Sequence, residues 1–380
     1  MNLGIDARLF YEQTGIGRYT RSLFAEYLRG NSLSDDQLFL FCDPSSSSSL
    51  STEKLPNNVH VVAAQCQRRI VWTNWFLPPL LCQHQIDVYH GVCNFELPLR
   101  KVCRYVVTIH DLVPLFFPTL VPKKHLLFFR LFMKRAAHTA DVIITDSEHS
   151  KRDIVRHLQV PEENVRVIYL GFTPPDSHND DRDTLGAVLR RYHISRPYLL
   201  FVGVLEPKKN LKRLVDAFVM VRKYCEQGKN LQLVLAGGKG WFSEQLYRKV
   251  QELHLNEHVV FTGYVADEDL PSLYRGAEMF VFPSIYEGFG LPVIEAMSCG
   301  TPVVTSASSS LPEIAGNAGV LVNPLDSHDI FQGIRTVLTN KEQQEAMRTA
   351  GPLQAQKFSW RHTAEQTYRV YHEVYSGLSS

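Results

Sequence analysis

Two acidic residues of the C-terminal half, Glu287 and Glu295, lie eight positions apart in the segment SIYEGFGLPVIE. An apolar run over 279–282 precedes them, and a helical pattern follows the Gly-Phe-Gly turn. The pattern predicts a strand, a loop that carries Glu287 and a helix that carries Glu295. Ligands of open parallel sheets bind at the carboxyl ends of the strands. A carboxylate buried there must be paired or hydrogen-bonded, and the hydroxyl groups of a sugar are suitable partners.

Two lysines, Lys208 and Lys209, lie between a predicted strand over 198–202 and a helix that begins near Asn210. The N-terminus of a helix carries a partial positive charge, so lysines are normally favoured at the opposite end. This placement favours an anion-binding role, in which the ammonium groups and the helix end bind a phosphate together. A solvated basic turn without a ligand is the alternative.

Glycine-rich turns follow three predicted strands of the same half. They contain Gly203, then Gly237 within AGGKG, then Gly263 followed by Tyr264. Turns after neighbouring parallel strands meet at one edge of the sheet. With the two lysines and the two acids they predict a pocket that has a phosphate-binding end and a hydroxyl-binding end.

The N-terminal half gives a weaker signal of the same kind at Gly15 and Gly17, which open the first predicted helix in TGIGRY. Glycines at a helix N-terminus allow an anion to approach the free N–H groups. A tight strand-to-helix turn without a ligand is an equal alternative. The dinucleotide pattern GxGxxG with an acid about 20 residues later is missing, which excludes an ordinary dehydrogenase.

A histidine, His110, ends another apolar strand and is followed by Asp111. A histidine in this position is often structural, but the carboxyl end of a strand in an α/β domain favours a functional role. His90 has a similar position on the preceding strand and is the weaker candidate.

No metal site and no cofactor are expected from the acids and cysteines. D-x-D patterns occur at 181–183 and 267–269, but neither follows a strand, so both predict structural acids, the second as helix caps. The seven cysteines form no CxxC pair and no zinc spacing, and buried, reduced thiols are the expected state.

The composition is that of a soluble globular protein, with 40 basic and 39 acidic residues and a net charge of +1. No nucleic acid or other polyanion is therefore expected as a partner. Neither a secretory signal nor a membrane span is predicted, so the expected location is the cytoplasm. The segment 123–135 mixes bases with Leu and Phe, and predicts either a core-packing helix with a basic face or a helix on the inner membrane surface.

Strands alternate with helices through the chain, which predicts an α/β fold made of two doubly wound domains. The first domain spans 1–183, with a polar hinge over 171–183, and the second spans 184–357. Residues 358–380 form a last helix, expected to extend the second domain or to cross back to the first. The expected strands are 3–6, 38–42, 59–63, 88–90, 105–109, 142–145 and 167–170, then 198–202, 231–236, 259–262, 279–282, 302–305 and 320–322. The expected helices are 17–29, 74–82, 124–139 and 148–157, then 211–225, 243–253, 267–275, 291–298, 326–338, 341–357 and 360–375.

Over nearly its whole length the chain resembles the family 4 retaining glycosyltransferases of the GT-B type. The most specific match is the Glu287-to-Glu295 segment within SIYEGFGLPVIEAMSCGTPVV. Further matches are GIGRYT, TIHDLVP, DSEHSKRDI, VGVLEPKKNL, FTGYVADEDL and FSWRHTAEQTYRVY. The resemblance implies two Rossmann-like domains facing a cleft. The C-terminal domain would hold the nucleotide sugar, the N-terminal domain would shape the acceptor site, and a last helix would cross back to the first domain.

The resemblance also implies roles for individual residues. Glu287 would contact hydroxyls of the transferred sugar, and Glu295 would hydrogen-bond the ribose. Lys209 would contact the diphosphate, and His110 would lie beside the reacting centre. The family often has Arg where this chain has Val204, and Lys208 is the candidate to replace this charge. The expected catalytic residues are therefore His110, Glu287 and Lys209, and the remaining donor-binding residues are Gly15, Gly17, Gly203, Lys208, Gly237, Tyr264, Gly288, Phe289, Gly290, Leu291 and Glu295.

The predicted activity is transfer of a hexose from a nucleotide sugar to a hydroxyl of a glycan or lipid-linked saccharide, with retention of configuration and without a metal. The N-terminal segments GIDAR and GIGRYT resemble bacterial O-antigen and exopolysaccharide mannosyltransferases, so GDP-mannose is the preferred donor and UDP-glucose the second choice. A sugar-nucleotide epimerase of the same fold and an inactive nucleotide-sugar-binding scaffold are the alternatives.

Overall fold

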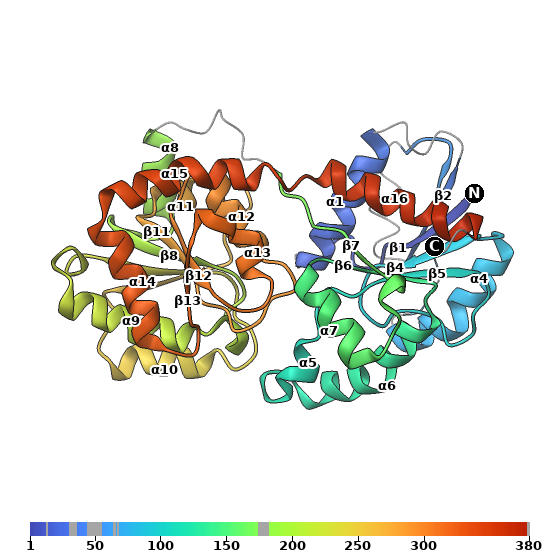
Figure 1. The fold of residues 1–380 in the computed structure, drawn as a ribbon, viewed down its shortest axis with the longest axis horizontal. Helices are drawn as coiled ribbons and strands as arrows, with labels where there is room; N and C mark the ends of the chain where they lie inside the picture. The colour runs from blue at the N-terminus through green and yellow to red at the C-terminus, as the bar shows by residue number, and fades with distance from the viewer. Residues whose placement is uncertain are drawn as a thin grey trace. The chain divides into compact units, whose positions relative to one another are not determined.

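The computed structural model describes residues 1–12, 14–29, 36–43, 55–63, 66, 68–173 and 182–377. It divides into two compact units (Figure 1). Unit 1 comprises Met1–Phe116, Lys123–Gly171 and Ser359–Ser380, and unit 2 comprises Phe117–Pro122 and Phe172–Phe358. The sequence hinge over 171–183 falls largely on 174–181, outside the described residues.

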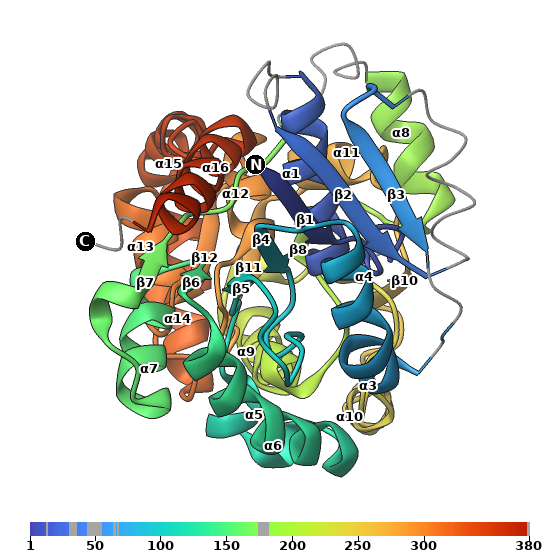
Figure 2. The same ribbon diagram turned by 90° about the vertical axis from the view of Figure 1, so that its right-hand side faces the viewer.

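Unit 1 is built on a parallel sheet in the order β3-β2-β1-β4-β5-β6-β7. Leu3 of β1 pairs with Leu38 of β2 on one side and with Val88 of β4 on the other, and Figure 2 shows β1, β2 and β3 side by side. The strands are almost continuously apolar because helices cover both faces of such a sheet. Their bounds are β1 Asn2–Asp6, β2 Gln37–Cys42, β3 Val59–Ala63, β4 Val88–Gly91, β5 Arg104–Thr108, β6 Val142–Thr145 and β7 Val165–Val167.

The helices of unit 1 include the last helix of the chain, α16. Thr363 of α16 donates a hydrogen bond to the Tyr169 carbonyl at 2.7 Å, and Tyr371 lies 2.7 Å from Nδ1 of His90 in β4. The bounds are α1 Gly15–Arg29, α3 Arg69–Val71, the π-turn η2 Trp72–Phe76, α4 Leu77–Gln83, α5 Val113–Phe116, α6 Lys123–Thr139, α7 Glu148–Leu158, the 3₁₀ turn η4 Glu162–Asn164 and α16 Trp360–Ser376.

Unit 2 repeats the architecture with a parallel sheet in the order β10-β9-β8-β11-β12-β13. All five residues of β8, Tyr198–Val202, are buried. The strands are β8 Tyr198–Val202, β9 Gln232–Ala236, β10 Val259–Gly263, β11 Met279–Phe282, β12 Val303–Ser306 and β13 Val320–Val322.

Helices cover both faces of the second sheet, with α11 and α12 on one face and α9 and α10 on the other (Figure 1). The helices and turns are η3 Pro118–Leu120, α8 Arg182–Arg191, η6 Pro207–Lys209, α9 Leu211–Tyr224, η7 Glu226–Gly228, α10 Glu244–Glu252, α11 Leu270–Gly276, α12 Leu291–Ser298, α13 Leu311–Ala315, η8 Gly316–Ala318, α14 Ser327–Thr339 and α15 Lys341–Ala355. The structure thus confirms the prediction of two parallel-sheet α/β domains.

Three elements have other bounds than predicted. The strand expected over 167–170 is β7, which spans Val165–Val167. The helix expected over 74–82 is one continuous helical segment that begins at Arg69 and contains a π-turn. The helix expected over 267–275 is α11, Leu270–Gly276, and Asp269 stands at its N-cap position without a side-chain capping hydrogen bond. Its carboxylate instead accepts hydrogen bonds from Arg191 at 2.7 Å and Tyr192 at 2.8 Å.

One helix and the burial of one cysteine also differ from expectation. Helix α8 was not predicted, since its polar N-terminal residues read as part of the hinge. The cysteines are free thiols, as expected, but Cys82 is exposed rather than buried.

Candidate functional site

Three glycines end three neighbouring strands of unit 2 in a left-handed backbone conformation. The φ angles are +147° at Gly203 after β8, +148° at Gly237 after β9 and +71° at Gly263 in β10. A β-carbon at Gly237 would lie 2.0 Å from the carbonyl oxygen of Gly203, so no other residue fits there. Gly237 therefore lets the chain after β9 run close to the chain after β8.

The loop after β11 places Glu287 against both lysines of the turn η6. Lys209 Nζ lies 2.6 Å from Glu287 Oε1 and Lys208 Nζ lies 3.7 Å from Oε2. Lys208 also lies 3.7 Å from Glu206. The acid and the two lysines therefore form one cluster. Residues expected at the phosphate-binding end and at the hydroxyl-binding end of the pocket therefore contact each other.

The cluster keeps the Glu287 side chain ionised although it is buried. Burial by itself would raise the pKa of Glu287, but the charges of Lys208 and Lys209 and hydrogen bonds from Lys209 and Ser284 hold the pKa below its ordinary value. The Ser284 hydroxyl donates to Glu287 Oε1 at 2.5 Å. A carboxylate that is ionised near neutral pH can accept hydroxyl hydrogen bonds, and it is a poor proton donor.

Serines after β12 hold the Glu287 loop by its backbone. Ser309 accepts a hydrogen bond from the Glu287 N–H at 3.0 Å. Ser310 donates to the carbonyl of Glu287 at 3.0 Å and to that of Phe289 at 2.6 Å. Sequence reasoning missed this support, although the run of serines over 308–310, shortly after the strand predicted over 302–305, was a visible signal.

The second acid, Glu295, lies on α12 and accepts a hydrogen bond from the Tyr274 hydroxyl at 2.9 Å. Helix α12 begins at Leu291 after Gly290, whose φ is +122°, and no side chain caps its N-terminus. Phe289 is buried and packs edge-to-face on Phe358, with ring centroids 5.6 Å apart. The segment from Glu287 through Gly288 to Leu291 thus leads from the charged cluster directly into the start of α12, where Pro292 has no N–H and the Val293 N–H donates to the Gly290 carbonyl at 2.9 Å.

Two other predicted donor-side positions remain on the surface. Tyr264 directly follows Gly263 and is 55% exposed. Val204, where the family often has Arg, is 50% exposed. Lys208, two residues before Asn210, brings a positive charge into the Glu287 cluster.

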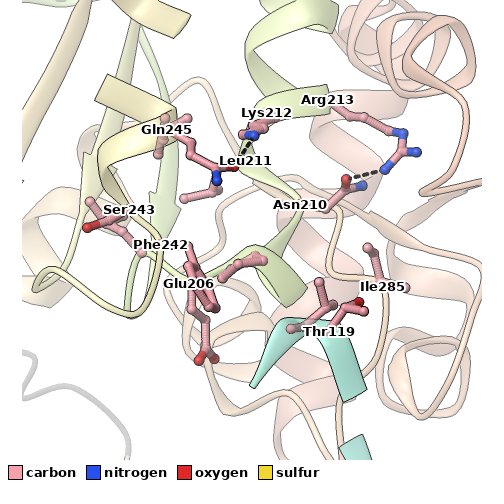
Figure 3. A pocket seen from close by; sticks show the side chains of 14 residues that line it. Thr119, Glu206, Asn210, Leu211, Lys212, Arg213, Phe242, Ser243, Gln245 and Ile285 are labelled. Carbon is pink, nitrogen blue, oxygen red and sulfur yellow. Dashed lines mark hydrogen bonds between the residues drawn. The ribbon is translucent and has the colours of Figure 1, made fainter. Parts of the chain in front are cut away.

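A cavity of about 370 Å³ lies beside this cluster in unit 2 (Figure 3). Glu206, Pro207 and Ile285 line it, whereas Lys209, Glu287 and Glu295 do not. Figure 3 shows Arg213 donating to Asn210 Oδ1 along its upper edge. The cavity adjoins the candidate site and is not the site itself.

In unit 1 the two glycines of the first helix have different surroundings. A β-carbon at Gly17 would lie 2.1 Å from the Glu12 carbonyl oxygen, whereas one at Gly15 would meet nothing within 4 Å. The Gly17 N–H donates to the Thr14 hydroxyl at 3.2 Å. Gly17 therefore has a steric reason to be glycine, while Gly15 is exposed and has none.

His110 follows β5, and both nitrogens of its ring have partners. Nδ1 lies 2.7 Å from Asp146 Oδ2, and Nε2 lies 3.0 Å from the Val92 carbonyl oxygen. The Asp146 carboxylate is 2% exposed. Sequence reasoning missed Asp146, although it opens the quoted motif DSEHSKRDI.

His90, the weaker candidate, has a structural role. Its ring is fully buried between the hydroxyls of Tyr371 and Thr108, each 2.7 Å away. Burial lowers the pKa of His90 to about 3, and His110 adds to the effect. The histidine therefore stays neutral and joins α16 to the sheet of unit 1.

Within the described residues, no group of three or more His, Cys, Asp or Glu side chains could hold a metal ion. Asp269, of the second D-x-D pattern, is engaged by Arg191 and Tyr192, and Asp181 of the first lies outside the described residues. Across the same parts of the chain, every helix is too short or too polar to cross a bilayer.

Comparisons with known proteins agree with this geometry. Residues 14–174 match the family described as Glycosyltransferase Family 4, and residues 193–354 match Glycosyl transferases group 1. The chain is 32% identical over 372 residues to the O-antigen chain mannosyltransferase B of Escherichia coli, covering 95% of this chain and 96% of the relative.

Solved structures share the fold at low sequence identity. The sucrose-phosphate synthase of Thermosynechococcus elongatus has a TM-score of 0.74 at 19% identity, over 99% of this chain and 100% of that one. Anabaena HepE in complex with UDP and glucose has a TM-score of 0.74 at 18% identity, over 98% of this chain and 100% of that one.

Proposed function

The chain belongs to glycosyltransferase family 4, and from that premise we propose that it transfers mannose from GDP-mannose to a hydroxyl of a glycan or lipid-linked saccharide, with retention of configuration and without a metal. The observation that carries the proposal is the buried cluster of Glu287 with Lys208 and Lys209 at the glycine-lined edge of the second sheet. The likeness to a mannosyltransferase named for the O-antigen chain supports the choice of sugar and of acceptor class.

The difficult step of such a transfer is the departure of the nucleoside diphosphate. The bond between the anomeric carbon and the diphosphate oxygen breaks, and the acceptor oxygen bonds to the same face of the sugar. In our proposal the acceptor's proton goes to the leaving phosphate. Lys208, Lys209 and the partial positive charge at the N-terminus of α12 stabilise the growing negative charge, and such preorganised electrostatic stabilisation is usually the largest contribution to catalysis. In unit 1, Gly15 at the start of α1 is proposed to let a phosphate approach the helix, whereas the Gly17 N–H already donates to Thr14.

The acids then have binding roles. Glu287 is ionised and accepts hydrogen bonds from Ser284 and Lys209. It therefore accepts hydrogen bonds from sugar hydroxyls and does not act as the general acid or the nucleophile of a glycosidase. When the diphosphate binds, it competes with Glu287 for Lys209 and leaves the carboxylate free for the sugar. Glu295, held by Tyr274, accepts hydrogen bonds from the ribose.

The donor is identified by a thermal-shift panel of GDP, UDP and ADP sugars, because a bound ligand stabilises the native state with the logarithm of its concentration over Kd. GDP-mannose is expected to give the largest shift. A shift with UDP-glucose alone would replace mannose by glucose. Conversion of the nucleotide sugar without any acceptor would point to an epimerase, and binding without turnover would point to a scaffold.

We further propose that unit 1 contacts the inner membrane surface, where a lipid-linked acceptor would be presented. Helix α6 packs Phe129 and Met133 into the core, so the core-packing interpretation holds for one of its faces. Its other face exposes Leu127 (57%) and Leu131 (59%) among Lys124, Arg130 and Lys134. Apolar side chains among bases are typical of helices that lie on anionic lipid surfaces.

A further inference from the structure

The ring of His110 has no nitrogen available to take a proton. Nδ1 faces the Asp146 carboxylate at 2.7 Å, and Nε2 faces the Val92 carbonyl at 3.0 Å. Carboxylate and carbonyl oxygens are acceptors, so each contact requires a proton between its two atoms. In this arrangement the imidazole cannot serve as a general base.

The buried carboxylate of Asp146 relies on His110 for its hydrogen bond. Among the described residues, Asp146 Oδ2 pairs with His110 alone, and Oδ1 is buried without a hydrogen-bond partner. An isolated carboxylate at this depth costs several kcal/mol, so it must be compensated by a shared proton. The proton of the His110–Asp146 contact is therefore part of the folded structure.

The groups around the ring are consistent with a proton in the His110–Asp146 contact. Tyr19 of α1 packs edge-to-face on the ring, with centroids 5.2 Å apart. His90 of β4 is neutral. Ser150 of α7 donates to the His110 carbonyl at 3.4 Å, and Asp111 follows in the chain and favours the protonated ring.

The pKa directions agree with this assignment. Burial by itself lowers the pKa of His110, but the Asp146 carboxylate outweighs it and raises the pKa above the ordinary value. Burial raises the pKa of Asp146, and His110 opposes that effect. Because the two groups titrate as a unit, the pair keeps its proton to a higher pH than a free histidine would.

We propose that Asp146 is a positioning residue of the transfer reaction: with the Val92 carbonyl it locks the His110 ring in one orientation with a proton in each contact, so that His110 acts as a fixed polar group and not as a base. The catalytic consequence rests on the proposed transferase function. The acceptor's proton must then leave by another route, which agrees with the leaving phosphate as its recipient.

The test combines Asp146→Asn with nuclear magnetic resonance of ¹⁵N-histidine-labelled full-length protein. His110→Gln assigns the signal of His110. In the wild type His110 should titrate above the ordinary histidine pKa of 6.5, and in Asp146→Asn its titration should move down. Asp153→Asn is the matched control, because it removes the acid of another His–Asp pair, His149–Asp153 on α7, and should leave the His110 signal unchanged.

Kinetics on the same proteins measure the consequence. Asp146→Asn should lower kcat on the order of 100-fold, the effect of a misplacement of about 1 Å, while KM for the donor stays close to that of the wild type. Its remaining activity should be greatest at lower pH, where His110 is still protonated. Asp153→Asn should keep wild-type kinetics.

Two results would overturn the proposal. One is a wild-type His110 that titrates as an ordinary histidine, a measurement that needs no variant to fold. The other is an Asp146→Asn protein whose His110 titration or kcat is unchanged. If the wild type turned over no nucleotide sugar at all, the proposed function would fall, and the titration would still decide whether Asp146 holds the ring.

Discussion

At the scale of single residues, the candidate site depends on compensation of buried charge. Glu287, Lys208 and Lys209 satisfy one another in unit 2, and His110 satisfies Asp146 in unit 1. Each of the two places contains an ionisable residue that was predicted from the sequence, Glu287 or His110, in contact with an ionisable partner. The sequence showed which residue types were present, but the pairings depend on loops whose path no local pattern specifies.

The Glu287→Gln variant should fold and should lose turnover by orders of magnitude. The amide keeps the volume of the side chain, but it leaves Lys208 and Lys209 without their carboxylate and cannot accept sugar hydroxyls at both oxygens. Steady-state transfer from the donor identified by thermal shift measures the loss. Glu345→Gln, at a 77% exposed side chain, is the control and should behave as the wild type. Near-wild-type transfer by Glu287→Gln would refute the assignment of the site.

The same substitution tests the acid side of stability. The pKa of Glu287 is lowered in the folded protein from a reference value of 4.5, so ionisation of Glu287 stabilises the fold fully above that value. This contribution is lost as the pH falls below 4.5 and through the lower folded pKa. Urea unfolding of wild type and Glu287→Gln should therefore give a difference in unfolding free energy that is constant near neutral pH and changes against the wild type below 4.5. A difference that does not depend on pH would show that Glu287 is not held ionised by the two lysines.

At the scale of elements, the parallel sheets were predictable and the loops were not. Strands such as Tyr198–Val202 and Met279–Phe282 were predicted with their observed bounds, because a strand covered on both faces is a continuous apolar run between turn residues. The backbone support of Glu287 by Ser309 and Ser310 comes from the turn after another strand. No local sequence pattern around Glu287 predicts such a long-range contact.

Substitutions in the serine segment 308–310 should change the position of Glu287 more than they change the stability of the fold. Ser309 has a φ of +54°, so Ser309→Gly relieves backbone strain while it removes the acceptor of the Glu287 N–H. Transfer should fall at least tenfold, whereas the melting temperature should stay near that of the wild type. Ser308→Ala, which removes a bond to the Ile285 carbonyl at 3.1 Å, is the matched control with a smaller effect on transfer. Equal activities of the two variants would remove Ser309 from the site.

The first helix offers a paired test of structural and functional glycines. Gly17→Ala places a methyl group against the Glu12 and Leu9 carbonyl oxygens, so the unfolding free energy should fall by more than about 1 kcal/mol. Gly15→Ala meets open space and should leave the fold at least as stable. If Gly15 lets a diphosphate approach the helix, Gly15→Ala should still raise the donor KM. Unchanged stability in Gly17→Ala, or unchanged KM in Gly15→Ala, would contradict the respective role.

At the scale of the whole molecule, the exposed apolar face of α6 serves neither the core of unit 1 nor the candidate site. Leu127 and Leu131 are more than half exposed on a helix whose opposite face is in the core, and bases flank them. Replacing both leucines by Glu removes apolar area and adds negative charge, so binding to anionic vesicles of phosphatidylglycerol and phosphatidylethanolamine should be lost in co-sedimentation. The control is Leu353→Glu on α15, where the leucine is 61% exposed; it should sediment as the wild type does. Transfer to a short water-soluble acceptor should be unchanged in the double variant, since neither leucine belongs to the candidate site. If wild type and double variant sediment equally, membrane contact through α6 is excluded and the leucines are ordinary surface residues.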